Sequence, residues 1–209
     1  MNVLIVDDHA VVRRGLAEML FDEFSGLEVG EADNAQQARQ FLRNREWDVA
    51  IVDIALPGES GLELLKEIRD QWPDLPVLVL SFHPEKRYAM RALRGGASGY
   101  LTKEAAPDEL VAAVQKVLKG GKYVTDSIAE RLAFRVADGG VHPPHEQLSD
   151  REYQVMLRIA SGKSVSDIAD EMHLSVNTIS TYRSRLLNKM NMETNAELTR
   201  YVVEHDLAD

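Results

Sequence analysis

Short apolar runs alternate with amphipathic segments along the first 121 residues, and this alternation constrains the fold more than any other feature of the chain. The clearest runs are continuously apolar, as strands buried on both faces are, and they span residues 3–6, 49–52 and 77–80. Weaker strand candidates lie at 27–31 and 98–101. Helical spacing of apolar residues between the strands predicts helices at about 10–22, 35–45, 61–71, 85–94 and 107–119. Five such units predict an α/β doubly wound, five-stranded parallel sheet with helices on both faces.

The pattern changes after Gly120-Gly121, where the last of these helices ends. A short amphipathic helix is expected at 127–136, and a loop or tether rich in Gly, Pro and His follows at 138–145. From Ser149 onward the strand pattern is absent, and about four helices fill the rest of the chain. We therefore predict a first domain over 1–121, a linker with a short helix over 122–146, and a small all-α domain over 147–209.

Paired polar residues mark the starts of several predicted helices. A Ser or Thr followed three residues later by Glu is the pattern of a capping box, in which each side chain bonds the other residue's backbone N–H. The pairs with this spacing are Ser60/Glu63, Ser149/Glu152 and Thr194/Glu197, with Asn34/Gln37 and Ser164/Asp167 as close variants.

Composition and charge limit the possible partners. The net charge is −10 at pH 7, and residues 141–209 carry seven basic against eleven acidic side chains, so any DNA binding has to come from a local patch. Cysteine is absent, which excludes disulfides and thiolate metal sites. Every apolar stretch is shorter than a membrane span, and acidic residues follow the start at once. We expect a cytoplasmic protein with no membrane partner.

Three carboxylates follow two of the predicted strands. Asp7 and Asp8 come directly after the run 3–6, and Asp53 comes after the run 49–52. In open α/β sheets, binding sites lie outside the carboxyl ends of the strands, so we expect the three carboxylates to converge there. Because they repel one another, we expect a hard divalent cation among them, such as Mg²⁺, which takes one or two carboxylates plus waters and a phosphate.

Two further residues fit the same pocket. Ser81 ends the run 77–80, and Lys103 follows the strand candidate at 98–101. A hydroxyl and an ammonium beside a metal-bound carboxylate form a site for a phosphoryl group, in which a carboxylate acts as nucleophile and becomes an aspartyl phosphate. The metal ion and the lysine would neutralise the charge that develops on the transferred oxygens.

This set of residues resembles the receiver domain of two-component response regulators, over residues 1 to about 121 and including Pro57. The resemblance implies a flavodoxin-like fold and makes Asp53 the phosphoacceptor. It implies that Mg²⁺ is bound by Asp8, Asp53 and the Ala55 backbone carbonyl, with Asp7 acting largely through water, and that Ser81 and Lys103 hold the phosphoryl oxygens. Tyr100 falls at the family's aromatic switch, which turns inward when Ser81 moves toward the phosphate.

Two residues depart from the receiver pattern. Phe82 follows Ser81 where many receivers carry a small residue, and its bulk is expected to restrict access to the phosphorylation site. Lys103 is followed by Glu104 where many receivers have proline, so a cis peptide bond at this position lacks its usual support. Both departures concern the rate and lifetime of phosphorylation, and every catalytic group is kept.

Residues 164–190 have the size and layout of a helix-turn-helix, with helices at 164–172 and 176–190 around a short turn. The apolar face of the second helix consists of Ile179, Tyr182, Leu186, Leu187 and Met190. The opposite stripe carries short neutral side chains that suit base edges in a major groove: Asn177, Ser180, Thr181, Ser184 and Asn188. The basic side chains that flank this stripe and suit phosphates are Arg183, Arg185 and Lys189.

The segments 148–152, 159–164, 177–180 and 194–198 look like a LuxR-type helix-turn-helix, so the whole chain resembles the NarL/FixJ family of response regulators. The resemblance implies a transcriptional regulator: a sensor histidine kinase phosphorylates Asp53, and this controls homodimerisation and binding to double-stranded promoter DNA. Its only catalysis would be its own phosphorylation and slow dephosphorylation. The last helix, 194–205, is the implied dimer contact. Ser180 stands where many members carry lysine, so softer base contacts and salt-sensitive affinity are expected.

Two other functions are compatible with parts of the pattern. A Mg²⁺-dependent phosphohydrolase with an aspartyl nucleophile carries a second Asp two residues after the first, but here that position is His9, and the helix-turn-helix would have no role. A constitutive DNA-binding regulator would use its first domain only for oligomerisation. Asp8, Asp53 and Lys103 argue against that hypothesis without excluding it.

Overall fold

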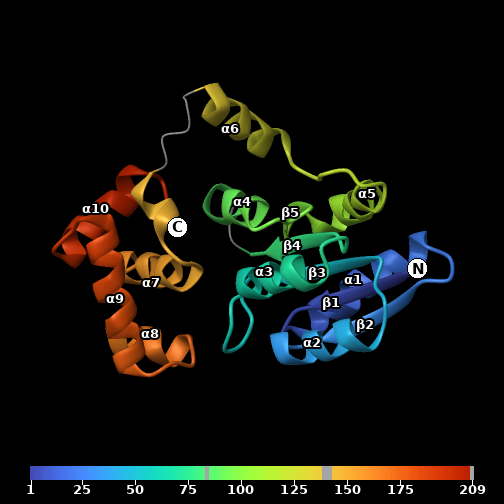
Figure 1. Cartoon of the computed structure of the whole chain (residues 1–209), viewed down its shortest axis with the longest axis horizontal. Coiled ribbons are helices and arrows are strands. Elements are labelled where there is room, and N and C mark those ends of the chain that lie inside the picture. The colour runs from blue at the N-terminus through green and yellow to red at the C-terminus, as the bar shows by residue number, and fades with distance from the viewer. Residues whose placement is uncertain (83–84, 138–142, 208–209) are drawn as a thin grey trace. The chain divides into compact units, whose positions relative to one another are not determined.

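The computed structural model describes residues 1–82, 85–137 and 143–207 and divides the chain into two compact units, Met1–Ala133 and Phe134–Asp209 (Figure 1). The division falls inside helix α6 (Asp126–Ala137). The domain limits given above stay predictions, and residues 138–142 of the expected tether lie outside the described residues.

The first unit is built on a parallel sheet with strand order β2-β1-β3-β4-β5. Its strands are β1 (Asn2–Val6), β2 (Glu28–Ala32), β3 (Val49–Asp53), β4 (Val77–Ser81) and β5 (Gly99–Thr102). The helices that connect and follow them are α1 (Ala10–Glu23), α2 (Ala35–Asn44), α3 (Gly61–Gln71), α4 (Glu85–Arg94) and α5 (Ala106–Leu118). The prediction of a doubly wound five-stranded sheet is confirmed, and its strand order is that of flavodoxin-like folds.

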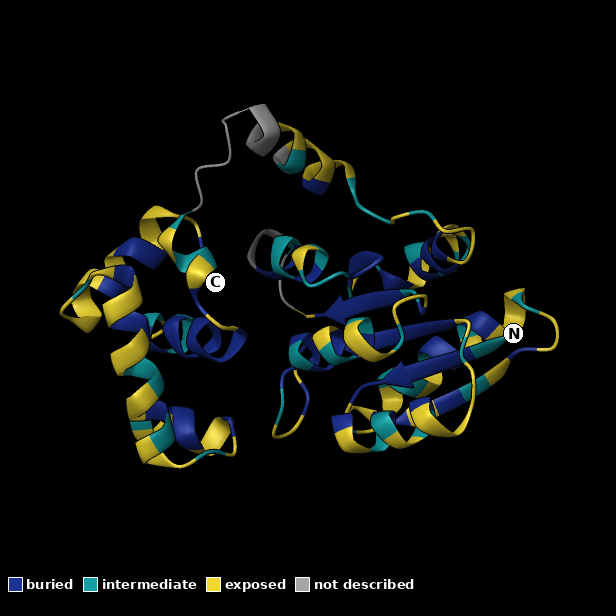
Figure 2. Cartoon of the chain, in the orientation of Figure 1, coloured by how far each residue is buried: buried dark blue, intermediate teal, exposed yellow. Residues whose placement is uncertain are grey.

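Both faces of the sheet are covered, which explains the continuously apolar strands. Successive side chains of a strand point to opposite faces. Val3 and Ile5 of β1 belong to a buried cluster with residues of α1 and α5, among them Leu20 and Val114. Helices α2, α3 and α4 contact β1, β3 and β5 respectively on the remaining face. Figure 2 shows the sheet buried and the outward sides of the helices exposed.

Four of the five helices for which the sequence predicts a polar pair begin with it. Reciprocal capping boxes are present at Ser60/Glu63, Ser149/Glu152, Ser164/Asp167 and Thr194/Glu197. The start of α2 differs. The Asn34 side chain accepts from the Gln37 N–H at 2.8 Å, but the Gln37 side chain accepts from the N–H of Asp33, one residue earlier than a capping box requires.

The first residues of the expected linker pack on the sheet unit. The Tyr123 N–H donates to the Ser98 carbonyl at 2.8 Å, and its hydroxyl donates to Glu109 on α5 at 2.8 Å. The Thr125 hydroxyl donates to Glu85 on α4 at 2.7 Å. The segment leading into α6 is therefore held against both helices that flank β5.

Every secondary-structure element that the structure describes in the second unit is a helix. They are the 3-10 helix η1 (Pro144–Gln147), α7 (Asp150–Ala160), α8 (Val165–Glu171), α9 (Val176–Met190) and α10 (Asn195–Glu204). The turn between α8 and α9 contains His173 at φ 53°, and α9 ends at Asn191, also left-handed, at φ 54°. Helix α9 packs against α7 and α8, as the second helix of a helix-turn-helix does.

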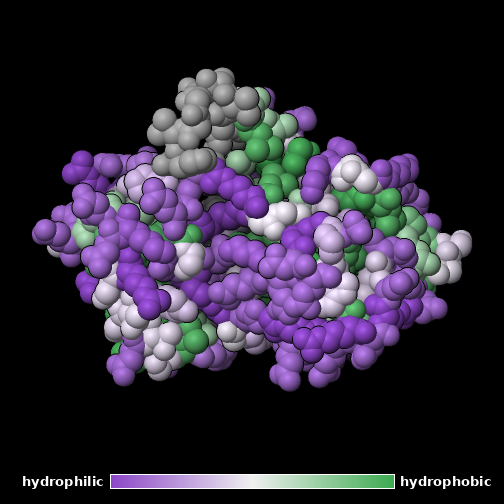
Figure 3. Space-filling model, viewed as in Figure 1, coloured by the Kyte–Doolittle hydropathy of each residue, from purple (hydrophilic) through white to green (hydrophobic). Residues whose placement is uncertain are grey.

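Polar side chains dominate the exterior of both units. Hydrophilic residues cover most of the face seen in Figure 3. Among the described residues, each helix is too short or too polar to cross a membrane.

Candidate functional site

Two buried carboxylates and one lysine meet at the carboxyl ends of the strands. Asp7 follows β1 and Asp53 ends the adjacent β3, and their side chains are 1% and 2% exposed. Lys103 follows β5, and its Nζ lies 2.6 Å from Asp7 Oδ2 and 2.7 Å from Asp53 Oδ2. The side chain of Lys103 is itself 3% exposed, so one buried ammonium serves two buried carboxylates.

In this arrangement the ammonium of Lys103 offsets only part of the cost of burying the charged Asp53 carboxylate. Burial raises the pKa of the Asp53 carboxyl above its usual value, the charge of Asp7 acts in the same direction, and the ammonium of Lys103 opposes both. Asp53 Oδ1 is buried and has no hydrogen-bond partner within the described part of the chain. A buried carboxylate oxygen without a partner is unfavourable unless a cation or a reacting group occupies the space beside it.

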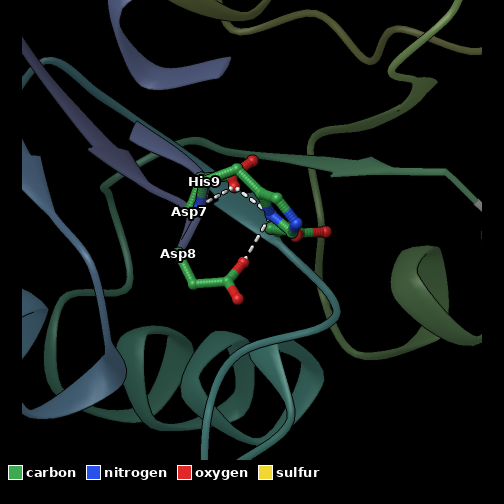
Figure 4. A group of neighbouring side chains, drawn as sticks. Asp7, Asp8 and His9 are labelled. Atoms are coloured by element: carbon green, nitrogen blue, oxygen red, sulfur yellow. Dashed lines mark hydrogen bonds and ion pairs between the residues drawn. The ribbon is translucent and has the colours of Figure 1, made fainter. Parts of the chain in front are cut away.

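Asp8 and His9 complete the acidic cluster. The Asp8 side chain is 35% exposed, and its Oδ1 lies 2.7 Å from Nδ1 of the His9 ring. Figure 4 shows the His9 imidazole joined by dashed lines to both neighbouring carboxylates. One donor atom from each of Asp7, Asp8, His9 and Asp53 lies within 4.8 Å of the others. Oxygen donors at this spacing, one of them buried and unpartnered, fit a divalent cation such as Mg²⁺.

The loop after β3 fixes the position of Asp53. Ala55 forms an isolated bridge with Ser60, and the Gly61 N–H donates to the Ile54 carbonyl at 2.9 Å. A Cβ atom on Gly61 would lie 1.8 Å from the Asp53 carbonyl oxygen. The start of α3 therefore presses directly on the end of β3. The backbone of Ala55 lowers the pKa of the Asp53 carboxyl and so favours its charged form. Coordination by the Ala55 carbonyl stays a prediction.

Ser81 and Tyr100 are in contact beside the cluster. Both residues are 0% exposed, at the end of β4 and on β5. Burial raises the pKa of the Tyr100 hydroxyl above its usual range, and a hydrogen bond with the Ser81 side chain opposes that rise. The Tyr100 ring is thus inward in this structure. Its role as a switch stays a prediction.

Phe82 lies over the cluster at the surface. Its side chain is among the exposed large hydrophobic ones, at 59%. The ring centroid lies 4.6 Å from Lys103 Nζ and 6.1 Å from the His9 ring, which meets it edge-on. The ammonium that contacts Asp53 thus also contacts the ring of Phe82. The peptide bond between Lys103 and Glu104 is trans, as are the others in the described residues.

The acidic cluster does not lie in the large surface groove of the first unit. A groove of about 1030 Å³ lies at the opposite ends of the strands, with Trp47, Trp72, Arg69 and Lys122 among its lining residues. It contains none of the acidic residues discussed above, so the candidate site is identified by its chemistry.

The second helix of the helix-turn-helix presents the polar stripe that the sequence predicts. Its apolar face is buried at Ile179, Leu186, Leu187 and Met190, while Tyr182 is half-buried. All five stripe residues are exposed: Asn177, Ser180, Thr181, Ser184 and Asn188. The Thr181 and Ser184 hydroxyls donate to the carbonyls four residues earlier, at 2.9 and 3.0 Å. Since each hydroxyl has one proton, these two offer acceptor oxygens to a ligand in this geometry.

The flanking basic residues differ in their partners. Arg183 Nε donates to Asn195 Oδ1 at 2.7 Å, and Lys189 Nζ lies 2.7 Å from Glu152 on α7. Burial favours a raised pKa for Glu152, but the hydrogen bonds from Lys189 and Ser149 outweigh it and lower the pKa below its usual value. Arg185 is exposed. The structure thus ties Arg183 and Lys189 to the domain itself, and their DNA contacts stay predictions.

Comparison with known proteins identifies the family. The family model described as response regulator receiver domain matches residues 3–115, and the model for bacterial regulatory proteins of the luxR family matches residues 146–202. The chain belongs to the NarL/FixJ response regulators. It is a DNA-binding transcriptional regulator with a receiver domain, and the phosphohydrolase hypothesis has no support from these matches.

Relatives resemble this response regulator over its full length. Response regulator UvrY of Escherichia coli strain K12 is 35% identical over 211 residues, covering 100% of this chain and 96% of UvrY. Response regulator GacA of Pseudomonas aeruginosa is 36% identical over 211 residues, covering 100% and 98%. RcsB from Salmonella enterica serovar Typhimurium, bound to promoter rprA with the phosphomimetic BeF₃⁻, has a TM-score of 0.65 and 26% identity, covering 97% of this chain and 98% of RcsB.

Sequence reasoning about the response regulator missed one residue of the cluster. His9 shows no ligand spacing with another histidine, and the predicted pocket did not include it. The structure places its Nδ1 at 3.2 Å from Asp7 Oδ1 and 2.7 Å from Asp8 Oδ1. The available signal was its position directly after two candidate ligands.

Proposed function

We propose that Asp53 is the phosphoacceptor of this regulator and that a sensor histidine kinase is its phosphodonor. The observation that carries the proposal is the state of the Asp53 carboxylate, with Oδ2 held 2.7 Å from Lys103 Nζ and Oδ1 buried without a partner. Oδ1 can take the metal ion while the other carboxylate oxygen attacks phosphorus, and the ammonium is in place to stabilise the transferred group.

The proposed transfer uses side chains at the carboxyl ends of the strands. A carboxylate oxygen of Asp53 forms a bond to phosphorus as the bond from phosphorus to the kinase imidazole breaks, and the imidazole leaves. Lys103 and the Ser81 hydroxyl hold the phosphoryl oxygens. Mg²⁺, held by Asp8, Asp53 and the Ala55 carbonyl with Asp7 acting through water, would supply further neutralisation of charge on those oxygens. Attack of water on phosphorus later restores the carboxylate. This self-phosphorylation and slow autodephosphorylation is the catalysis we assign to the chain.

The phosphoryl group acts through Ser81 and Tyr100. Movement of the Ser81 hydroxyl toward a phosphoryl oxygen changes its hydrogen bond with Tyr100 and fixes the ring in the inward position that it has in this structure. For a clean switch, the phosphoryl group has to favour the active conformation over the inactive one by about 5.5 kcal/mol. The receiver thereby controls homodimerisation and promoter binding in the cytoplasm.

DNA binding is assigned to the exposed stripe on α9, with Arg183, Arg185 and Lys189 as phosphate contacts. Support comes from two RcsB structures, described as two RcsB dimers bound to two parallel DNAs and as an RcsB–DNA complex, both 27% identical to this chain with TM-scores of 0.59. Helix α10 is the proposed dimer contact, and its Val203 side chain is 62% exposed.

The test of this function is intact mass of the full chain after incubation with acetyl phosphate, with Mg²⁺ and with chelator. One phosphoryl adduct is expected with Mg²⁺ and almost none with chelator, and hydroxylamine should remove the adduct because it is an acyl phosphate. A fresh sample that shows no adduct at short times would instead support a constitutive DNA-binding regulator.

Replacing Arg185 by alanine is expected to weaken DNA binding about five- to tenfold and to reduce the slope of log K against log salt by about 1, because one phosphate contact is lost. The loss should be similar for a duplex selected from a random-sequence pool and for an unrelated duplex. Fluorescence anisotropy over a salt series measures both quantities. Arg43→Ala, which removes an exposed arginine of α2 in the first unit, is the matched control. A slope equal to that of wild type would show that Arg185 does not contact phosphate.

Replacing Phe82 by alanine is expected to raise the rate constant for phosphorylation by acetyl phosphate by a factor of about three to ten, because the ring restricts entry to the cluster. Hydrolysis of the phosphoryl group should accelerate in parallel, since water uses the same path. Time courses of the adduct mass give both rate constants. Unchanged rate constants would mean that Phe82 packs beside the entrance without restricting it.

A further inference from the structure

We propose that His9 is a metal ligand of the acidic cluster and gives it a preference for a divalent transition metal ion over Mg²⁺. The inference rests on the metal site of the proposed function and adds a nitrogen donor to it.

The spacing of the donor atoms supports one shared ion. An octahedral ion with bonds of 2.0–2.1 Å holds adjacent ligand atoms about 3.0 Å apart. Nδ1 of His9 lies 2.7 Å from Asp8 Oδ1, near that value. It lies 3.2 Å from Oδ1 of Asp7, the carboxylate that acts through water. One donor atom of Asp53 lies within 4.8 Å of a donor atom on each of these residues, so all of them border the same space. The close-up shows the imidazole facing both carboxylates (Figure 4).

The backbone and a neighbouring ring hold the imidazole in place. The His9 N–H donates to Asp7 Oδ1 at 2.9 Å, and His9 is the extended N-cap residue of α1, at φ −86°. Arg13, one turn into that helix, donates to the Asp7 carbonyl at 2.6 Å. The edge-on contact with Phe82 supports the ring from the other side. A side chain positioned in advance loses less freedom when it binds an ion.

A histidine between two carboxylates is often only a hydrogen-bond partner. The second, independent observation here is Asp53 Oδ1, an oxygen on a side chain that is 2% exposed and has no partner among the described residues. A cation beside that oxygen would relieve its unfavourable burial. His9 lies next to the same carboxylates and could provide a further ligand to such a cation. Mg²⁺ takes oxygen ligands, whereas divalent transition metal ions also accept imidazole nitrogen, Mn²⁺ most weakly and the later ions of the series more strongly. An imidazole donor therefore raises the affinity of this cluster for a transition metal ion, with Mn²⁺ as the smallest case, more than its affinity for Mg²⁺.

The experiment uses metal-free full-length protein titrated with Mn²⁺ and, in competition, with Mg²⁺. The electron paramagnetic resonance signal of free Mn²⁺ gives both affinities, and pulsed measurements detect coupling of bound Mn²⁺ to a nitrogen nucleus. We compare wild type with His9→Ala and with His173→Asn, which removes an exposed histidine while keeping a residue that tolerates φ 53°. Thermal melting confirms that each variant is folded.

Wild type and His173→Asn should show nitrogen coupling, and His9→Ala should lose it together with about tenfold in Mn²⁺ affinity, while Mg²⁺ affinity stays within about twofold. Bound Mn²⁺ without nitrogen coupling in wild type would overturn the proposal, as would an equal loss of both affinities in His9→Ala. Those results would leave the oxygen-ligand metal site of the proposed function intact. If neither ion binds wild type, the proposed metal site does not exist, and the proposal that His9 is one of its ligands is contradicted as well.

Discussion

Asp53→Ala is expected to take up no phosphoryl group from acetyl phosphate and Mg²⁺, under conditions in which wild type gains one. Asp53 is the carboxylate that combines burial, contact with Lys103 and an oxygen without a partner. Asp7 is equally buried, but its Oδ1 already accepts from the His9 N–H, and Asp8 is too exposed to share the ammonium. Intact mass spectrometry at short times after mixing measures the adduct directly.

The loss should not come from unfolding. Lys103 is shared by two buried carboxylates that repel each other, so removing one of them leaves a single buried ion pair and relieves the repulsion. The melting temperature of Asp53→Ala should therefore equal or exceed that of wild type. Asp70→Ala, which removes an exposed aspartate of α3, is the matched control and should be phosphorylated normally. An adduct on Asp53→Ala equal to that on wild type would contradict the assignment of the site.

Gly61→Ala is expected to destabilise the receiver by about 3 kcal/mol or more, among the largest effects of a single added methyl group. Its Cβ would lie 1.8 Å from the Asp53 carbonyl oxygen and 2.8 Å from the Asp53 carbonyl carbon, so either α3 or the end of β3 has to move. The contacting atoms are backbone, which cannot rotate away as a side chain can. Urea unfolding monitored by circular dichroism gives the free energy of unfolding.

Gly15→Ala provides the comparison for that experiment. Gly15 lies inside α1, and a Cβ there would meet nothing within 4 Å. Alanine at such a position should stabilise the domain by about 0.5–1 kcal/mol, because glycine loses more backbone freedom on folding. Opposite signs for the two substitutions are expected. If Gly61→Ala unfolds at the same urea concentration as wild type, the close packing of α3 on β3 is wrong.

Much of the fold follows from short-range patterns. The continuous apolar runs identify the strands, and the capping pairs at Ser60 and Ser149 identify helix starts, because these signals involve residues adjacent or one turn apart. The meeting of Asp7, Asp53 and Lys103 was also predictable, since the carboxyl ends of parallel strands lie at one edge of the sheet. The same local logic was insufficient at Asn34, where the Gln37 side chain bonds Asp33.

The sequence by itself determined the fold class, the family and the three carboxylates of the acidic cluster, because the ends of the predicted strands place them without any knowledge of distances. Only the tertiary structure decided how those residues are paired. It shows that Lys103 bridges two carboxylates, that His9 joins them, and that Lys189 pairs with Glu152 on another helix. Each of these pairings requires atoms to be placed to within a few tenths of an ångström. Packing sets the side-chain rotamers that decide those positions, and periodicity in the sequence carries no information about rotamers.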